Sequence, residues 1–136
     1  MIVTPDSLRQ RSVVFLFVCS ANIARSATAE HMARAGRCLA DSVGSDPRVA
    51  VRHLTLETIM RARRIICMED ENAEAVLRLA PQRAGDIIVW NIPDTYHYGE
   101  PALMAEIRPR LNPLIEQWHQ QRYLFLGPHG EQFEEQ

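Results

Sequence analysis

The chain has 136 residues, of which 46% are hydrophobic and 24% are charged, and its formal net charge is −2. This composition is typical of one ordinary globular domain, so we expect residues 1–136 to form a single domain. The slightly acidic balance offers no basic surface to nucleic acid or to an anionic membrane, and no apolar segment reaches the length of a transmembrane helix.

The cysteines argue for a reducing compartment. Cys19, Cys38 and Cys67 form neither a CxxC pair nor a zinc-type spacing, and their odd number disfavours the disulfide framework of a secreted protein. We therefore expect a cytoplasmic protein that needs no metal or other cofactor. We also expect a monomer or a weak dimer.

Apolar runs alternate with helix-type segments along the chain. Residues 12–19 (SVVFLFVC) are apolar without alternation, as in a parallel strand that is covered on both faces. Ser26 is suited to cap the helix that follows, which we predict to end near Leu39. The other predicted elements are a strand at 41–44, a helix at 55–61, a strand at 64–68, a helix at 69–79, a strand at 86–90 and a helix from 101 to about 122.

This alternation predicts an α/β fold with three layers, α/β/α, around a central four-stranded parallel sheet. We expect a core over residues 12–122 and a flexible tail over residues 123–136, which are polar and rich in turn formers. In such sheets ligands bind beyond the carboxyl ends of the strands. Two loops fall there, the one that follows Cys19 and the one at residues 91–100.

The loop after Cys19 has the composition of an anion-binding site. A strand, a small and polar loop and a helix follow one another, and Arg25 stands six residues after the cysteine. Backbone N–H groups, the positive end of the helix dipole and a guanidinium would all favour the thiolate of Cys19. The loop is therefore expected to bind a phosphate and to attack it.

Five segments together resemble the low-molecular-weight protein tyrosine phosphatases. They are FVCSANIARS with the helix start ATAEHMARA, SVGSDP (residues 42–47), ARRIICMED (62–70) and IPDTYHYG (92–99). The resemblance covers nearly the whole domain and is strongest to a compact bacterial branch of predicted tyrosine phosphatases. It implies the phosphotyrosine protein phosphatase I-like fold.

The sequence departs from the usual family pattern at four positions. Ala21 replaces a common glycine, Ala24 a common second cysteine, Ala27 a proline after the Arg-Ser pair, and Thr95 the proline after the aspartate. The stretch between the first helix and the third strand is also short.

The resemblance assigns three catalytic roles. Cys19 is the nucleophile that forms a phosphocysteine, and Arg25 binds two equatorial phosphate oxygens. Asp94 protonates the leaving phenolate and then activates water. The plainer alternatives are a buried structural cysteine, a surface ion pair and a turn aspartate.

The other expected site residues support the phosphate or the substrate. Ser26 donates to the thiolate or simply caps the helix, and Asn22 either adopts a left-handed backbone or bonds across the loop. Tyr96 and Tyr98 line the substrate pocket, unless one of them packs on the domain. The phosphate-binding backbone comes from Ser20, Ala21, Asn22, Ile23 and Ala24, together with Arg25 and Ser26.

Two other features have plain explanations. His97 is expected to be a solvent-facing loop residue, and the acidic residues 69–71 suit the start of a helix.

The leading prediction is a protein tyrosine phosphatase that acts on a phosphotyrosine protein or a small aryl phosphate. One alternative is an arsenate reductase-like thiol enzyme, which Ala24 and the strand position of Cys67 disfavour. The other is a non-catalytic module that binds phosphate or a phosphoprotein, which the presence of Cys19, Arg25 and Asp94 disfavours.

Overall fold

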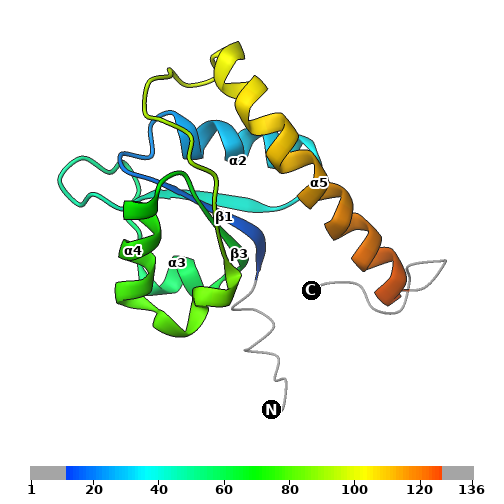
Figure 1. The fold of residues 1–136 in the computed structure, drawn as a ribbon. Helices are drawn as coiled ribbons and strands as arrows, with labels where there is room; N and C mark the ends of the chain where they lie inside the picture. The colour runs from blue at the N-terminus through cyan, green and yellow to red at the C-terminus, as the bar shows by residue number, and fades with distance from the viewer. Residues whose placement is uncertain (1–11, 127–136) are drawn as a thin grey trace.

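A parallel sheet of four strands lies at the centre of the molecule (Figure 1). The structure is a computed structural model that describes residues 12–126. The strands are β1 (Val13–Cys19), β2 (Ala40–Gly44), β3 (Ala62–Cys67) and β4 (Ile87–Val89), in the spatial order β2-β1-β3-β4. Cys19 is in register with Gly44 of β2, and Val18 is in register with Cys67 of β3. The carboxyl end of β1 therefore lies between the carboxyl ends of β2 and β3.

Within residues 12–126, two α-helices cover each face of the sheet (Figure 1). On one face α2 (Arg25–Ala35) and α5 (Pro101–Leu126) pack on Phe15 and Phe17. On the other face α3 (Leu56–Met60) and α4 (Asp70–Leu79) pack on Leu16 and Val18, and a 3₁₀-helix over Pro81–Asp86 leads into β4. The predicted three-layer α/β/α architecture is confirmed.

Every residue of β1 is buried, because alternate side chains enter the two helix-covered cores. This explains why the strand is apolar without alternation. The first and last residues of the other strands agree with the predicted ones to within about two positions. No helix among residues 12–126 is both long enough and apolar enough to cross a lipid bilayer.

The start of α2 differs from the prediction. The helix begins at Arg25, and its N-cap is Ala24, with no side-chain hydrogen bond to the cap. Ser26 lies inside the first turn, so the prediction that it caps the helix is wrong. The hydroxyl of Ser26 points to Cys19 instead, as described below.

The ends of α2 and α5 also differ. The first helix stops at Ala35 rather than near Leu39, because the amide of Cys38 bonds back to Ala33 and Arg37 adopts a left-handed φ of 64°. The last helix continues to Leu126 although it contains Pro109 and Pro113. Residues 123–126 are therefore helical and not a tail, and residues 127–136 lie outside the described residues.

Candidate active site

The segment that joins β1 to α2, called here the Cys–Arg loop (residues 19–25), turns sharply around a cysteine. Asn22 has a left-handed φ of 59°, and its backbone N–H donates to Sγ of Cys19 at 3.2 Å. Its side-chain Nδ2 donates to Oγ of Ser26 at 2.9 Å. The two alternatives predicted for Asn22, a left-handed backbone and an amide bond across the loop, are both present.

Ser26 completes the contacts of the sulfur. Its Oγ lies 3.0 Å from Sγ of Cys19 and 3.5 Å from the carbonyl oxygen of Val43. This Oγ also accepts from Nδ2 of Asn22, and in its contact with Sγ either group can be the donor. The sulfur of Cys19, a residue that is 3% exposed, therefore accepts from the amide of Asn22 and lies within hydrogen-bond distance of the Ser26 hydroxyl.

Three carbonyl groups of the Cys–Arg loop are bonded to the segment that follows β2. The carbonyl oxygens of Cys19, Ser20 and Ala21 accept backbone hydrogen bonds of 2.8, 3.1 and 3.0 Å from the segment after β2. In a planar trans peptide the next N–H points the opposite way, as the amide of Asn22 does when it meets Sγ. The amides of Ser20, Ala21 and Asn22 are therefore turned away from the segment after β2.

The side chains at the other loop positions differ in exposure. Ser20 and Ala21 are half-buried, Ile23 is exposed, and Ala24 is buried.

Arg25 is 1% exposed and is anchored through one end of its guanidinium. Its Nη1 donates to Oε1 of Glu69 at 2.6 Å and to the carbonyl oxygen of Ile92 at 2.8 Å. Its buried Nε has no hydrogen-bond partner and lies 3.7 Å from Oδ1 of Asp94. A buried donor without an acceptor is costly, so this atom is suited to an incoming oxygen.

The loop that carries Asp94 (residues 91–100, called here the Asp94 loop) leaves the sheet after β4. Its first turn is fixed by the amide of Ile92, which donates to the carbonyl of Met68 at 3.0 Å. The side chain of Asp94 is 66% exposed and lies within reach of Arg25. The structure thus brings Asp94 close to Arg25, which lies on the same loop as Cys19.

The two loop tyrosines have different environments. Tyr96 is half-buried and packs against the core beneath α2 and α5, whereas Tyr98 is 57% exposed. His97 is exposed, as expected. Of the two rings, that of Tyr98 is therefore the more exposed.

Glu69 was predicted only as part of an acidic helix start, and its contact with Arg25 was missed. It precedes α4 as its N-cap, and Asn72 closes a capping box with it. Asn72 also donates to Oγ of Ser45 at 2.9 Å, and the amide of Ser45 donates to the carbonyl of Cys19 at 2.8 Å. The position of Glu69, just past the strand next to the cysteine strand, was the available signal.

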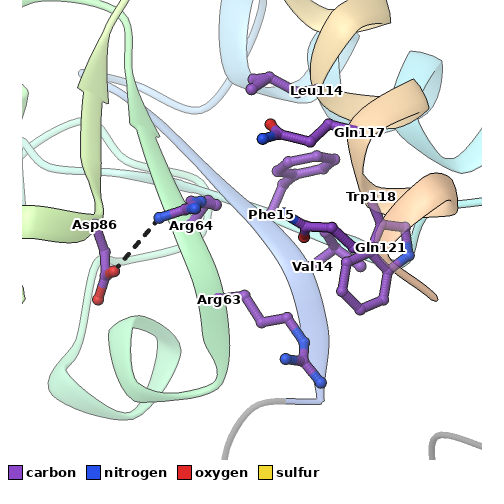
Figure 2. A pocket seen from close by; sticks show the side chains of 9 residues that line it. All are labelled: Val14, Phe15, Arg63, Arg64, Asp86, Leu114, Gln117, Trp118 and Gln121. Atoms are coloured by element: carbon purple, nitrogen blue, oxygen red, sulfur yellow. Dashed lines mark ion pairs between the residues drawn. The ribbon is translucent and has the colours of Figure 1, made fainter. Parts of the chain in front are cut away.

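One hollow of the described part lies beside the site, and another lies away from it. An open groove of about 470 Å³ runs beside the site and is lined by Glu69, Asp70, Glu71, Glu74, Asn91, Ile92 and Pro93. A second hollow of about 210 Å³ lies between the sheet and the distal half of α5, where Phe15, Trp118 and the Arg64–Asp86 ion pair face one another (Figure 2). It holds none of the predicted site residues. No group of three or more His, Cys, Asp or Glu within residues 12–126 is arranged to hold a metal ion.

The sheet order and the Cys–Arg loop at the end of the central strand β1 define a low-molecular-weight protein tyrosine phosphatase-like fold. A phosphatase from Vibrio cholerae O395 matches with a TM-score of 0.61 and 17% identity over 80% of this chain and 98% of the other. Vibrio vulnificus Wzb, solved with benzylphosphonate, matches with a TM-score of 0.60 and 19% identity over 81% of this chain and 99% of the other. Erwinia amylovora AmsI, a tyrosine phosphatase, matches with a TM-score of 0.58 and 20% identity over 81% of this chain and 93% of the other.

At the level of sequence the comparisons find less. No protein-family model matches the chain, and the search of curated proteins finds no match. The likeness is therefore one of fold.

Proposed function

We propose that this protein is a cysteine-dependent phosphatase that hydrolyses phosphotyrosine or small aryl phosphate monoesters through a phosphocysteine. The observation that carries the proposal is the unpartnered Nε of Arg25 beside Asp94, in the loop that begins at Cys19. Wzb of Vibrio vulnificus, which shares the fold, was solved with benzylphosphonate, a ligand that joins an aromatic ring to a phosphorus oxyanion.

A second buried arginine shows why the Nε of Arg25 is informative. Arg83 is 3% exposed, and its guanidinium donates to Asp86 at 2.7 Å and to the carbonyls of Ile59 and Ala62 at 2.8 and 2.6 Å. Each guanidinium nitrogen of Arg83, which lies outside the proposed site, thus makes at least one hydrogen bond. Among the described residues only one other buried side-chain atom lacks a hydrogen bond, Oδ2 of Asp41, which lies 3.8 Å from the guanidinium of Arg61.

The reaction that we propose has two displacements at phosphorus. The thiolate of Cys19 attacks the phosphorus, an S–P bond forms, and the bond to the phenolic oxygen breaks as Asp94 gives that oxygen its proton. A water molecule then loses a proton to the carboxylate of Asp94 and attacks the phosphorus. The S–P bond breaks, inorganic phosphate leaves, and the thiolate is restored.

Arg25 and the loop amides bind the equatorial oxygens in both steps. Their contacts strengthen as negative charge moves onto these oxygens in the transition state. Ser26 and the amide of Asn22 stabilise the sulfur when it leaves as a thiolate. The mechanism requires no metal or other cofactor.

The wider proposal keeps the remaining expectations from the sequence. Residues 1–136 act as one cytoplasmic domain of the compact bacterial branch, as a monomer or a weak dimer, without nucleic acid or membrane partners. Tyr98 contributes to the wall of the substrate pocket, because its ring is exposed on the Asp94 loop.

The arsenate reductase-like alternative receives little support from the other thiols. Cys67 is fully buried in β3, and burial raises the pKa of its thiol to about 12. A thiol in this state is a poor partner for exchange with an oxidised Cys19.

The test is hydrolysis of p-nitrophenyl phosphate at mildly acidic pH with EDTA present. We expect turnover by the wild type, none by Cys19→Ser, and a phosphorylated cysteine in the wild type after rapid acid quench. Turnover that persists in Cys19→Ser would overturn the mechanism. Phosphate binding without turnover would favour a binding module, and thioredoxin-dependent arsenate reduction would favour the reductase.

A further inference from the structure

The Asp94 loop is attached to the helix that begins at the Cys–Arg loop. At its start, the carbonyl of Ile92 accepts from Nη1 of Arg25 at 2.8 Å. At its other end, the backbone N–H of Gly99 donates to Oγ1 of Thr28 at 2.9 Å. Arg25 and Thr28 are three residues apart on α2, so both attachments come from one face of the same helix.

Thr28 is well placed to fix this end of the loop. It is 2% exposed, and its own backbone N–H is already used in α2, where it donates to the carbonyl of Ala24 at 2.8 Å. Its β-branched side chain is restricted in χ1, so the hydroxyl has few alternative positions. The contact therefore links a rigid helix to a backbone atom of the loop.

The turn next to Gly99 is held by its own bonds. The amide of His97 donates to the carboxylate of Glu100 at 3.0 Å, and the amide of Glu100 donates to the carbonyl of His97 at 3.1 Å. These bonds shape the turn but do not attach it to α2. The bond to Thr28 sets where the turn lies relative to the Cys–Arg loop.

We propose that Thr28 is a positioning residue that sets the reach of Asp94 to the leaving-group oxygen. The inference rests on the proposed phosphatase function. It predicts that removing the hydroxyl of Thr28 has the effect of a partial loss of Asp94 as general acid. A small displacement of the carboxylic acid strongly slows proton transfer to the leaving oxygen. The decrease in kcat/KM should then be larger for esters whose leaving group needs a proton and smaller for those whose leaving group does not.

The experiment compares Thr28→Val, which keeps the shape and removes the hydroxyl, with Thr28→Ser, which keeps the hydroxyl. The value of kcat/KM is measured with phenyl phosphate, p-nitrophenyl phosphate and 2,4-dinitrophenyl phosphate. In Thr28→Val the value of kcat/KM should fall about tenfold with phenyl phosphate. It should fall little with 2,4-dinitrophenyl phosphate, whose leaving group needs no proton. Thr28→Ser should recover most of the loss. Asp94→Asn serves as the reference for complete loss of the acid.

A second readout does not depend on turnover. Amide hydrogen exchange at Gly99 should be faster in Thr28→Val than in the wild type, while amides of β1 and β3 keep their protection. Unchanged exchange at Gly99, or an equal loss of kcat/KM with all three esters, would overturn the role of Thr28 and leave the phosphatase proposal standing. Absence of hydrolysis by the wild type would overturn both.

Discussion

Nη1 of Arg25 lies 2.6 Å from Oε1 of Glu69, and this contact joins the first turn of α2 to the residue that caps α4. The side chain of Glu69 is 38% exposed, whereas that of Arg25 is 1% exposed. The buried guanidinium of Arg25 is therefore held by a carboxylate that is partly exposed to solvent. This leaves Nε of Arg25 directed to the region of Asp94.

Removing the carboxylate of Glu69 should release Arg25. We expect Glu69→Ala to lower kcat/KM for p-nitrophenyl phosphate by tenfold or more, because a displaced guanidinium meets the phosphate oxygens poorly. The free energy of unfolding should fall by about 1 kcal/mol, a modest value because Glu69 is partly solvated. Steady-state kinetics and urea unfolding measure the two effects.

Glu74→Ala is the matched control for Glu69→Ala. Glu74 lines the same acidic groove and is exposed, and within residues 12–126 it forms no ion pair. If both variants lost activity equally, the effect would come from the negative potential of the groove and not from the position of Arg25.

Two substitutions of Asn22 separate its backbone from its side chain. Asn22→Gly keeps the left-handed conformation but loses the donor to Ser26, so stability should be nearly retained while kcat falls. Asn22→Ala loses the same donor and adds backbone strain, which should cost about 1–2 kcal/mol of stability. Thermal unfolding and hydrolysis of p-nitrophenyl phosphate measure the two effects. Equal stability of the two variants would contradict a strained backbone at this position.

Gly44 permits the close approach between β2 and the Cys–Arg loop. A Cβ at this position would lie 2.6 Å from the carbonyl oxygen of Ser20 and 2.7 Å from Cβ of Ala50. Gly44→Ala should displace the loop, lower the free energy of unfolding by about 1–3 kcal/mol and reduce activity. Gly85→Ala is the control, since its Cβ would meet nothing within 4 Å. Comparable activity losses in the two variants would contradict the steric explanation.

Cys67 should make the protein less stable in alkali. Burial raises the pKa of this thiol to about 12 from its ordinary value of 9.0. Above the unfolded pKa the unfolded chain has lost the proton and the folded chain has kept it. The free energy of unfolding therefore falls with rising pH, by about 1.4 kcal/mol per pH unit for this one group.

Urea unfolding of the wild type and of Cys67→Ala at about pH 8 and about pH 10 measures this contribution. Between these two pH values the wild type should lose about 1.4 kcal/mol more than the variant. Other groups that titrate in this range are common to both proteins, so equal losses would show that the thiol of Cys67 ionises normally in the folded state.

Local sequence was sufficient to predict the architecture, and together with the family resemblance it supplied the three catalytic residues that we propose. The apolar residues of β1 can be buried on both sides only in a sheet that helices cover on both faces, so composition and alternation reveal the layers. Cys19 and Arg25 lie on one short loop, so their relation is encoded within seven residues. Asp94 was predicted because the family resemblance extends to its loop, and the structure places its Oδ1 3.7 Å from Nε of Arg25.

The contacts that hold these residues depend on the packing of distant segments. Ser26 has the chemistry of a helix cap, and only the left-handed turn at Asn22 makes it a partner of Cys19. Glu69 looks like an ordinary acidic helix start until the pairing of β1 with β3 brings it to Arg25. Thr28 meets Gly99 because α2 and the Asp94 loop lie over the same face. Short-range pattern determines which residues are buried and which element they form, but contacts across the sheet follow from strand order and register, which no single segment encodes.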